Sequence, residues 1–157
     1  MFLVADSLEN RAAVIRYFLK KHPSVALVVA AAYFEWTVSR ALVALSDRPN
    51  RDVREALAGT YGLDRYKDLW RSEQRNLPGA QPLPELVKDW NGVTNAFVER
   101  NRLVHGRDRH TRNMARPHVE VLLSAVTDIY QYAEVHGVNL RERLPIRKKI
   151  RTARNVK

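Results

Sequence analysis

The sequence predicts an all-α bundle of about five to six helices, and two features of the chain support this prediction. Apolar residues recur at intervals of three and four over long stretches, and no run of strict alternation between apolar and polar residues indicates a strand. In addition, 45% of the 157 residues are hydrophobic, which is enough for one domain to bury a core without disulfides. We therefore expect a helical domain over residues 1–139 and a basic C-terminal tail over residues 140–157.

The first two helices are expected over residues 7–21 and 24–46. Pro23 separates them, because the residue before a proline is disfavoured in the helical conformation. The second helix is apolar on almost all sides, which indicates burial. It also has the length of a membrane span, but Glu35 lies near its middle, and a charge at mid-bilayer costs about 2.5 to 3.5 kcal/mol. We therefore expect a core helix and no membrane association.

Two shorter helices are expected next, over residues 51–59 and 63–74. Asn50 precedes the first of them and is a favoured residue type for capping its free N–H groups. Residues 76–84 contain three prolines and a glycine, a composition that predicts a loop.

The fifth and last helices are long. The fifth is expected from residue 84 to residue 104, because Pro84 suits a first helical turn and Gly106 suits the position after a helix end. The last helix is expected over residues 117–136, where the amphipathic pattern is clearest, and Gly137 follows it.

The net charge of +10 is concentrated in two segments. Residues 100–116 hold six arginines and one acid, residues 140–157 hold eight basic residues and one acid, and the remainder of the chain sums to −2. Such patches are typical of proteins that bind polyanions, because each neutralised phosphate releases counterions. The expected RNA-binding residues are Arg102, Arg107, Arg109, Arg112, Arg116, Arg147, Lys148, Lys149 and Arg151.

The chain has no cysteine, so disulfides, thiolate metal sites and thiol nucleophiles are excluded. This composition and the short apolar start, which lacks the length of a signal-peptide core, favour a cytoplasmic protein. Four histidines show no metal-ligand spacing, and we expect them on the surface or in loops and expect no metal or cofactor. They are His22, His110, His118 and His136.

A polar pair interrupts the apolar stripe of the fifth helix. One turn beyond Phe97 the inward positions are occupied by Arg100 and Asn101, and His105 follows four residues later, on the same face as Asn101. Burying polar groups costs free energy of folding unless they find hydrogen-bond or ionic partners. We therefore take this end of the helix as the candidate functional site.

These side-chain types suit cleavage of an RNA phosphodiester. The imidazole of His105 is suited to take a proton from a 2′-hydroxyl or give one to the leaving 5′-oxygen. The guanidinium of Arg100 is suited to stabilise charge on the phosphate oxygens, and Asn101 either orients the imidazole or holds the phosphate. One histidine does not serve both sides of an in-line displacement, which favours a two-fold homodimer with two copies of the set.

Glu35 is a carboxylate in the most apolar helix, and a buried carboxylate must be paired or neutralised. We expect it to pair with Arg100 and to support catalysis by fixing that side chain. The alternative is that Glu35 only reaches the surface or pairs with Arg40.

Residues 100–105, Arg-Asn-Arg-Leu-Val-His, resemble the Arg-x(4–6)-His motif of the HEPN superfamily, in which a polar residue often follows the arginine. The surrounding helices, including Ala-Tyr-Phe-Glu-Trp at residues 32–36, are similar to those of the family over about residues 10 to 137. The resemblance implies a HEPN-like bundle and a homodimeric, metal-independent endoribonuclease that leaves 2′,3′-cyclic phosphate ends. It also implies a role as a toxin, a phage-defence effector or an RNA-processing enzyme, with an antitoxin or defence-system partner. Arg107 occupies the place of a tyrosine that some toxin members carry as a modification site.

Two other pairs also satisfy the Arg-x(4–6)-His motif, Arg16 with His22 and Arg112 with His118. The first ends at Pro23, and the second contains Pro117, so neither is expected to lie on a continuous helix. The rival function is a non-catalytic RNA-binding or assembly module of the same fold. A DNA-binding helix-turn-helix is disfavoured, because no short turn joins two compact helices with base-reading residues.

Overall fold

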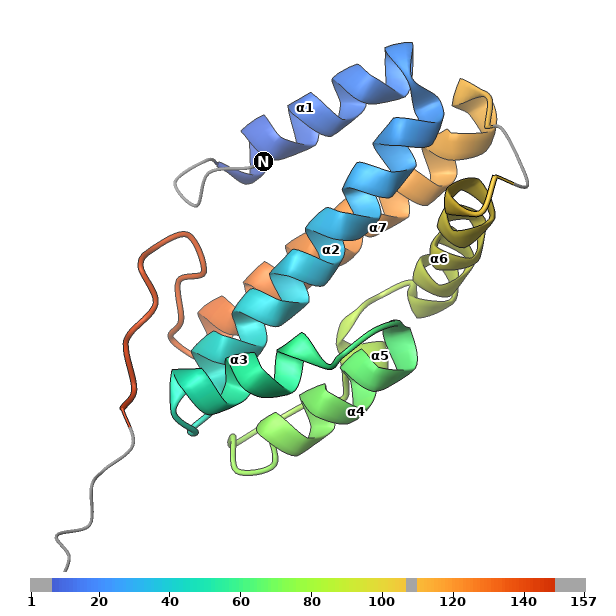
Figure 1. Ribbon diagram of the computed structural model, residues 1–157. Helices are drawn as coiled ribbons and strands as arrows, with labels where there is room; N and C mark the ends of the chain where they lie inside the picture. The colour runs from blue at the N-terminus through green and yellow to red at the C-terminus, as the bar shows by residue number, and fades with distance from the viewer. Residues whose placement is uncertain (1–6, 107–109, 149–157) are drawn as a thin grey trace, which may run out of the picture.

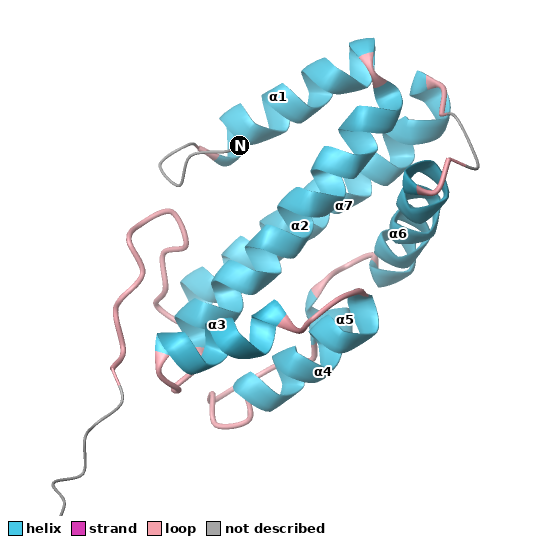
Figure 2. Cartoon of the chain, in the orientation of Figure 1, coloured by secondary structure: helices cyan, strands magenta, loops and turns pink. Residues whose placement is uncertain are grey.

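The computed structural model describes residues 7–106 and 110–148. Within these ranges the chain forms seven helices and no strand, which confirms the all-α prediction (Figure 1, Figure 2). The helices in chain order are α1 (Leu8–Lys21), α2 (Pro23–Leu45), α3 (Asn50–Ala58), α4 (Leu63–Glu73), α5 (Leu83–Leu86), α6 (Trp90–Val104) and α7 (Arg112–Val135).

Helix α2 forms the centre of the bundle. It packs lengthwise against α7 and also contacts α1 and α6, while α3 and α4 cover its C-terminal half (Figure 1). Burial of apolar side chains drives this packing, at about 25 cal/mol per Å² removed from water. The core side chains with almost no exposure include Ile15, Leu27, Phe34, Leu42, Trp70, Val93, Val119, Leu122 and Ile129.

Helix α2 is also the single helix in the described part of the chain that is long and apolar enough to cross a membrane. More than half of its most apolar stretch is buried by neighbouring helices. A central helix of a bundle has this same composition, because all of its faces meet other side chains.

Asp89 divides the predicted fifth helix into α5 and α6. Its carboxylate accepts a hydrogen bond from the Gly92 backbone N–H at 2.8 Å and so caps a new helix. The backbone N–H of Lys88 donates to the Asp128 carboxylate of α7 at 3.1 Å, which fixes the extended turn between the two helices. The prediction of one continuous helix was wrong here, because capping and the Asp128 contact outweigh the unbroken apolar stripe.

Helix α7 begins five residues before its predicted start. Thr111 caps it, with Oγ1 accepting from the Met114 N–H, and Pro117 lies inside the helix instead of at its first turn. Proline removes one backbone N–H from the helix interior. The neighbouring carbonyl that loses its partner belongs to Asn113, which is exposed, so this carbonyl is accessible to solvent.

Asn50 does not cap α3 as predicted. Pro49 occupies the capping position, and the Asn50 side chain instead binds the C-terminal segment. Its Nδ2 donates to the carbonyl of Pro145 at 2.9 Å, and its Oδ1 accepts from the backbone N–H of Arg147 at 2.8 Å. The described part of the basic tail therefore lies against α3.

Candidate active site

The C-terminal half of α6 places the three residues of the candidate site. Its inner face packs against α2 and α7 through Val93, Ala96 and Phe97, which are all buried. The Phe97 ring meets Phe34 of α2 edge to face, with centroids 5.8 Å apart. Arg100 follows Phe97 by one turn, so the packing that anchors α6 also brings the guanidinium toward α2.

Arg100 lies beside Glu35 of α2, as the sequence predicted. Arg100 Nη2 is 3.9 Å from Glu35 Oε2, and the two side chains are 28% and 24% exposed. The alternative pairing with Arg40 is not observed, because that guanidinium donates to the backbone carbonyls of Leu140 and Glu142.

Glu35 and Arg100 only partly satisfy each other. Burial raises the pKa of the Glu35 carboxyl, and the positive charge of Arg100 opposes this shift. Arg100 Nη1 donates to Asn101 Oδ1 at 3.0 Å, but its Nε is buried and has no hydrogen-bond partner among the described residues. The guanidinium is thus held in place while part of its donor capacity is unused.

Asn101 and His105 are both exposed at the end of α6. His105 is the C-cap, its backbone N–H donates to the Asn101 carbonyl at 3.0 Å, and Gly106 follows with a φ of +68°. Since the Asn101 side-chain oxygen accepts from Arg100, its NH₂ group is the part left to hold a phosphate. Within residues 7–106 and 110–148, no side chain is hydrogen bonded to the His105 imidazole.

A buried histidine lies next to this site, and no pattern in the sequence had indicated its burial. His110 had been expected on the surface or in a loop; it precedes α7 in a loop, but its side chain is only 2% exposed. Its Nε2 is 3.1 Å from Glu99 Oε2, and Glu99 Oε1 also accepts from Arg102 Nη1 at 2.7 Å. Glu99 thereby ties the chain that follows His105 back onto α6.

The second arginine–histidine pair that the sequence had set aside also lies on a continuous helix. Arg112 and His118 are both within α7, because Pro117 does not interrupt it. The ring of His118 lies 6.4 Å from that of His110, measured between centroids. The presence of Pro117 between Arg112 and His118 was therefore not a sufficient reason to expect that this pair lies off a continuous helix.

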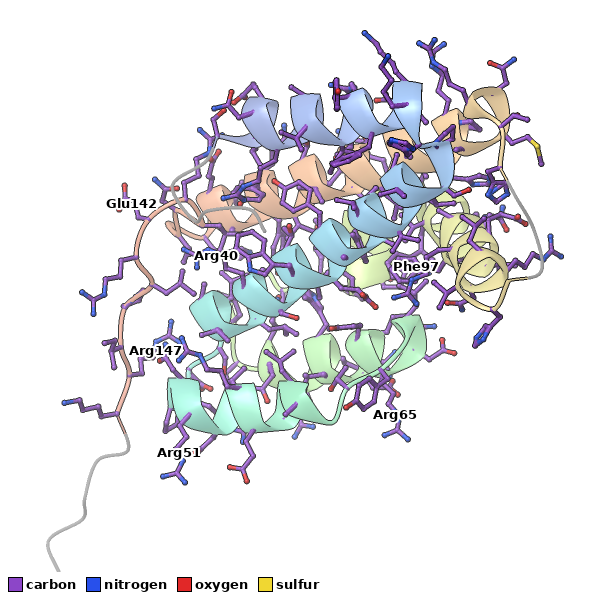
Figure 3. All side chains as sticks on the ribbon, turned by 45° about the horizontal axis from the view of Figure 1, so that its top comes forward. Arg40, Arg51, Arg65, Phe97, Glu142 and Arg147 are labelled. Carbon is purple, nitrogen blue, oxygen red and sulfur yellow. The ribbon has the colours of Figure 1, made fainter. Side chains whose placement is uncertain are left out.

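The residues expected to bind RNA fall into two groups that are far apart. Arg102, Arg112 and Arg116 are exposed on α6 and on the first turns of α7, close in sequence to His105. Arg147 and Lys148 lie at the other end of the bundle, where the tail meets α3 (Figure 3). The remaining members lie outside the described residues: Arg107, Arg109, Lys149 and Arg151.

Arg147 also has a structural role that the sequence did not predict. Its guanidinium donates to the carbonyl of Ala44 at the end of α2, and its backbone exchanges hydrogen bonds with Asn50. It therefore serves to anchor the tail.

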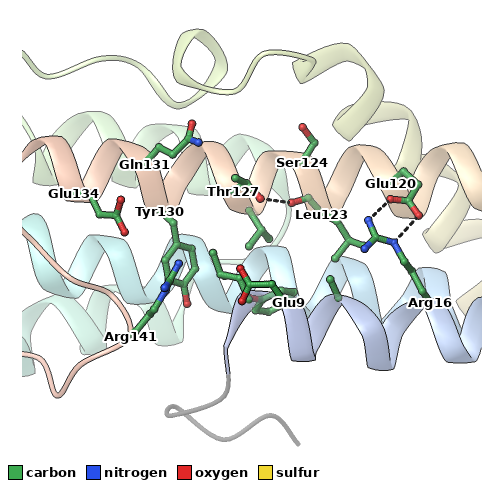
Figure 4. A pocket seen from close by; sticks show the side chains of 14 residues that line it. Glu9, Arg16, Glu120, Leu123, Ser124, Thr127, Tyr130, Gln131, Glu134 and Arg141 are labelled. Atoms are coloured by element: carbon green, nitrogen blue, oxygen red, sulfur yellow. Dashed lines mark hydrogen bonds and ion pairs between the residues drawn. The ribbon is translucent and has the colours of Figure 1, made fainter.

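A groove of about 490 Å³ between α1 and α7 does not include the candidate site. Arg16 and Glu120 close one end of it with paired hydrogen bonds of 2.9 and 2.6 Å, and Arg141 lies at the other (Figure 4). Among the described residues, no cluster of histidine or carboxylate side chains is arranged to hold a metal ion.

The candidate site is thus an exposed helix end with one half-buried, incompletely satisfied guanidinium. This geometry is open enough for a polymeric substrate, and it places an imidazole, an amide and a cation within two helical turns. No protein-family model, curated protein or solved structure matches the chain.

Proposed function

We propose that this protein is a metal-independent endoribonuclease with Arg100, Asn101 and His105 in its active site. The observation that carries the proposal is the state of Arg100, which is held by Glu35 and Asn101, is partly exposed, and lies on the same helix as the exposed His105 that caps its end. A side chain held in this way is prepared to bind an anion without reorganising at the moment of reaction.

The proposed reaction is a transesterification within the RNA. The ribose 2′-oxygen attacks the adjacent phosphorus while the bond from phosphorus to the 5′-oxygen breaks, which leaves a 2′,3′-cyclic phosphate and a 5′-hydroxyl. One imidazole accepts the 2′-hydroxyl proton and another group donates a proton to the leaving oxygen. His105 performs one of these transfers, and Arg100 stabilises the charge on the two non-bridging oxygens.

A second copy of the chain supplies the other proton transfer. The two transfers occur on opposite sides of the phosphorus, out of reach of one imidazole, and a two-fold axis near His105 brings two copies of the set together. Exposed apolar side chains lie on the second half of α6 and on the first turn of α7, and an interface between copies requires such side chains. They are Val98, Val104 and Met114.

The test is an RNA-cleavage assay in excess EDTA. Purified protein is incubated with tRNA and mRNA beside the variants His105→Ala and Arg100→Ala, with His22→Ala as a matched control at an exposed histidine elsewhere. We expect His22→Ala to cut like the wild type and the other two to lose at least a hundredfold in rate, in line with losses from removing an acid–base or oxyanion-stabilising group. New ends should accept a label at the 5′-hydroxyl without prior phosphatase treatment.

The second candidate is a non-catalytic RNA-binding or assembly module of the same fold. It is favoured by the exposed apolar residues around His105 and by the absence, among the described residues, of a side chain that orients the imidazole. In that case all four proteins behave alike in the cleavage assay while they still retain RNA. A HEPN-like identity, a cytoplasmic location and a toxin or phage-defence role with an antitoxin or defence-system partner belong to the nuclease proposal, and they rest on the resemblance of residues 100–105.

A further inference from the structure

A basic groove lies where the C-terminal segment runs along α2 and α3. In Figure 1 and Figure 3 this segment lies at the end of the molecule away from α6. Arg40 of α2 holds this segment by donating to the carbonyls of Leu140 and Glu142. Asn50 holds it further along, through the Pro145 carbonyl and the backbone of Arg147. The groove is therefore formed by a segment that hydrogen bonds hold in place.

Arginines dominate the lining of this groove. Its volume is about 630 Å³, and its lining holds four arginines and no acid. An adjoining hollow of about 740 Å³ shares Asn50, Arg54 and Ile146 with it and adds three basic residues and two acids. The residues that line the first groove are Arg40, Asn50, Arg54, Arg141, Arg143, Leu144 and Ile146.

The four arginines divide by what they already bind. Arg40 is engaged with backbone carbonyls and over the Trp36 ring, so it supports the groove. Arg54, Arg141 and Arg143 are exposed, and within residues 7–106 and 110–148 their guanidinium groups make no hydrogen bond or ion pair.

Glu55 lines the adjoining hollow with Arg54, and Glu134 lines the groove between α1 and α7 with Arg141, but neither acid forms a hydrogen bond or ion pair with these arginines among the described residues. The Glu142 carboxylate is bound to the Asn139 side chain at 2.9 Å. The pKa of the Glu9 carboxyl is lowered by hydrogen bonds from the Glu9 backbone N–H and from Ser7. The positive charge of Arg141 contributes in the same direction. Unpaired positive charges around one hollow repel one another, which raises the free energy of the empty groove. A bound anion offsets this repulsion.

We propose that this groove binds the sugar-phosphate backbone of single-stranded RNA, with Arg54, Arg141 and Arg143 as the phosphate-contacting residues. The planar guanidinium matches the geometry of a phosphate, and Leu144 and Ile146 offer an apolar wall against which a base packs. A concave channel fits a strand, whereas a lipid surface favours an exposed and flat basic face. This binding requires no cleavage, so it does not rest on the proposed nuclease activity.

The experiment measures binding to an RNA that the proposed chemistry cannot cut. The probe is a fluorescein-labelled single-stranded RNA of about 20 nucleotides with 2′-O-methyl riboses throughout, followed by anisotropy between 50 and 300 mM KCl. The groove variant combines Arg54→Ala, Arg141→Ala and Arg143→Ala. The control removes the same charge at exposed positions outside both hollows, through Lys20→Ala, Arg65→Ala and Arg71→Ala.

We expect the groove variant to raise Kd at least tenfold and the control less than twofold. The slope of log K against log salt should fall by roughly 2 in the groove variant, because each phosphate contact to a single strand contributes about 0.7. Equal losses in the two triple variants, or an unchanged salt slope, would overturn the proposal, as would groove-dependent binding to phosphatidylserine vesicles in place of RNA. Circular dichroism confirms that both triple variants are folded.

Discussion

Glu35 and Arg100 join the central helix to the candidate active site: Glu35 Oε2 on α2 lies 3.9 Å from Arg100 Nη2 on α6. Burial disfavours the charged carboxylate and Arg100 only partly offsets this, so the pKa of Glu35 is raised. We therefore expect the ionised Glu35 carboxylate to lower stability at neutral pH while it holds the Arg100 guanidinium in place. A stabilising change that harms activity is the expected signature of such a site.

We predict that Glu35→Gln increases the free energy of unfolding at pH 7 and lowers RNA cleavage. A glutamate with a raised folded-state pKa is destabilising where it is charged, above that pKa, and this effect disappears as the pH falls below the ordinary glutamate value of about 4.3. Urea denaturation should therefore separate the variant from the wild type at pH 7 and not at pH 4. A variant less stable than the wild type at pH 7 would show that the ion pair is net stabilising.

The activity of the same variant should fall by roughly tenfold to a hundredfold, since a small displacement of Arg100 from its position is costly. Glu55→Gln serves as the control, because Glu55 is exposed on α3 and away from α6. Full activity in Glu35→Gln would remove Glu35 from the support of catalysis.

The proposed composite site makes a quantitative prediction for mixed dimers. If both copies contribute a His105, wild type exchanged with a ninefold excess of His105→Ala should lose roughly tenfold in activity, because random pairing leaves few intact dimers. The measurement is cleavage after subunit exchange, with a ninefold excess of His22→Ala as the control. Activity that stays proportional to the wild-type chain would mean that one copy suffices.

The packing of α2, α6 and α7 was predictable because their apolar stripes are long and regular, and such stripes fix which face is buried. The pairing of Glu35 with Arg100 was predictable for the same reason, since each is a charge placed on a face that must meet protein. The boundary at Asp89 and the early start of α7 at Arg112 were missed. The first depends on the Asp89 cap and the Lys88–Asp128 hydrogen bond, and the second on the Thr111 cap, and such contacts change a boundary without altering the apolar pattern.

The burial of His110 and the docking of the tail had no usable signal in the sequence. His110 meets Glu99 across a loop, and nothing in an interval of eleven residues distinguishes this pair from two surface residues. The tail is held mostly through backbone carbonyls, which every residue carries, by Arg40, Asn50 and Arg147. The basic residues of the tail, which the sequence analysis had treated alike, therefore include one that anchors the segment, Arg147, and others that are exposed, Arg141 and Arg143.

We predict that Glu99→Ala destabilises the fold by about 1–3 kcal/mol, because it leaves the buried His110 imidazole without its partner. Arg102→Ala removes the other contact of Glu99 but at an exposed position, so its cost should stay below about 1 kcal/mol. Urea unfolding of the two variants checks this order. Equal values would indicate that Glu99 does not hold the loop after α6.

The attachment of the tail is tested by Asn50→Ala, which removes the hydrogen bonds to Pro145 and Arg147. Each such bond contributes about 0.5–1.5 kcal/mol, and the backbone bond from residue 50 to the Arg147 carbonyl persists in the variant. We therefore expect faster amide exchange at Arg147, measured by hydrogen–deuterium exchange, with unchanged protection in α7. Since Arg143 and Arg141 line the groove only while the tail is docked, RNA binding should weaken in parallel. Loosening of the tail without weaker binding would separate the groove from RNA recognition.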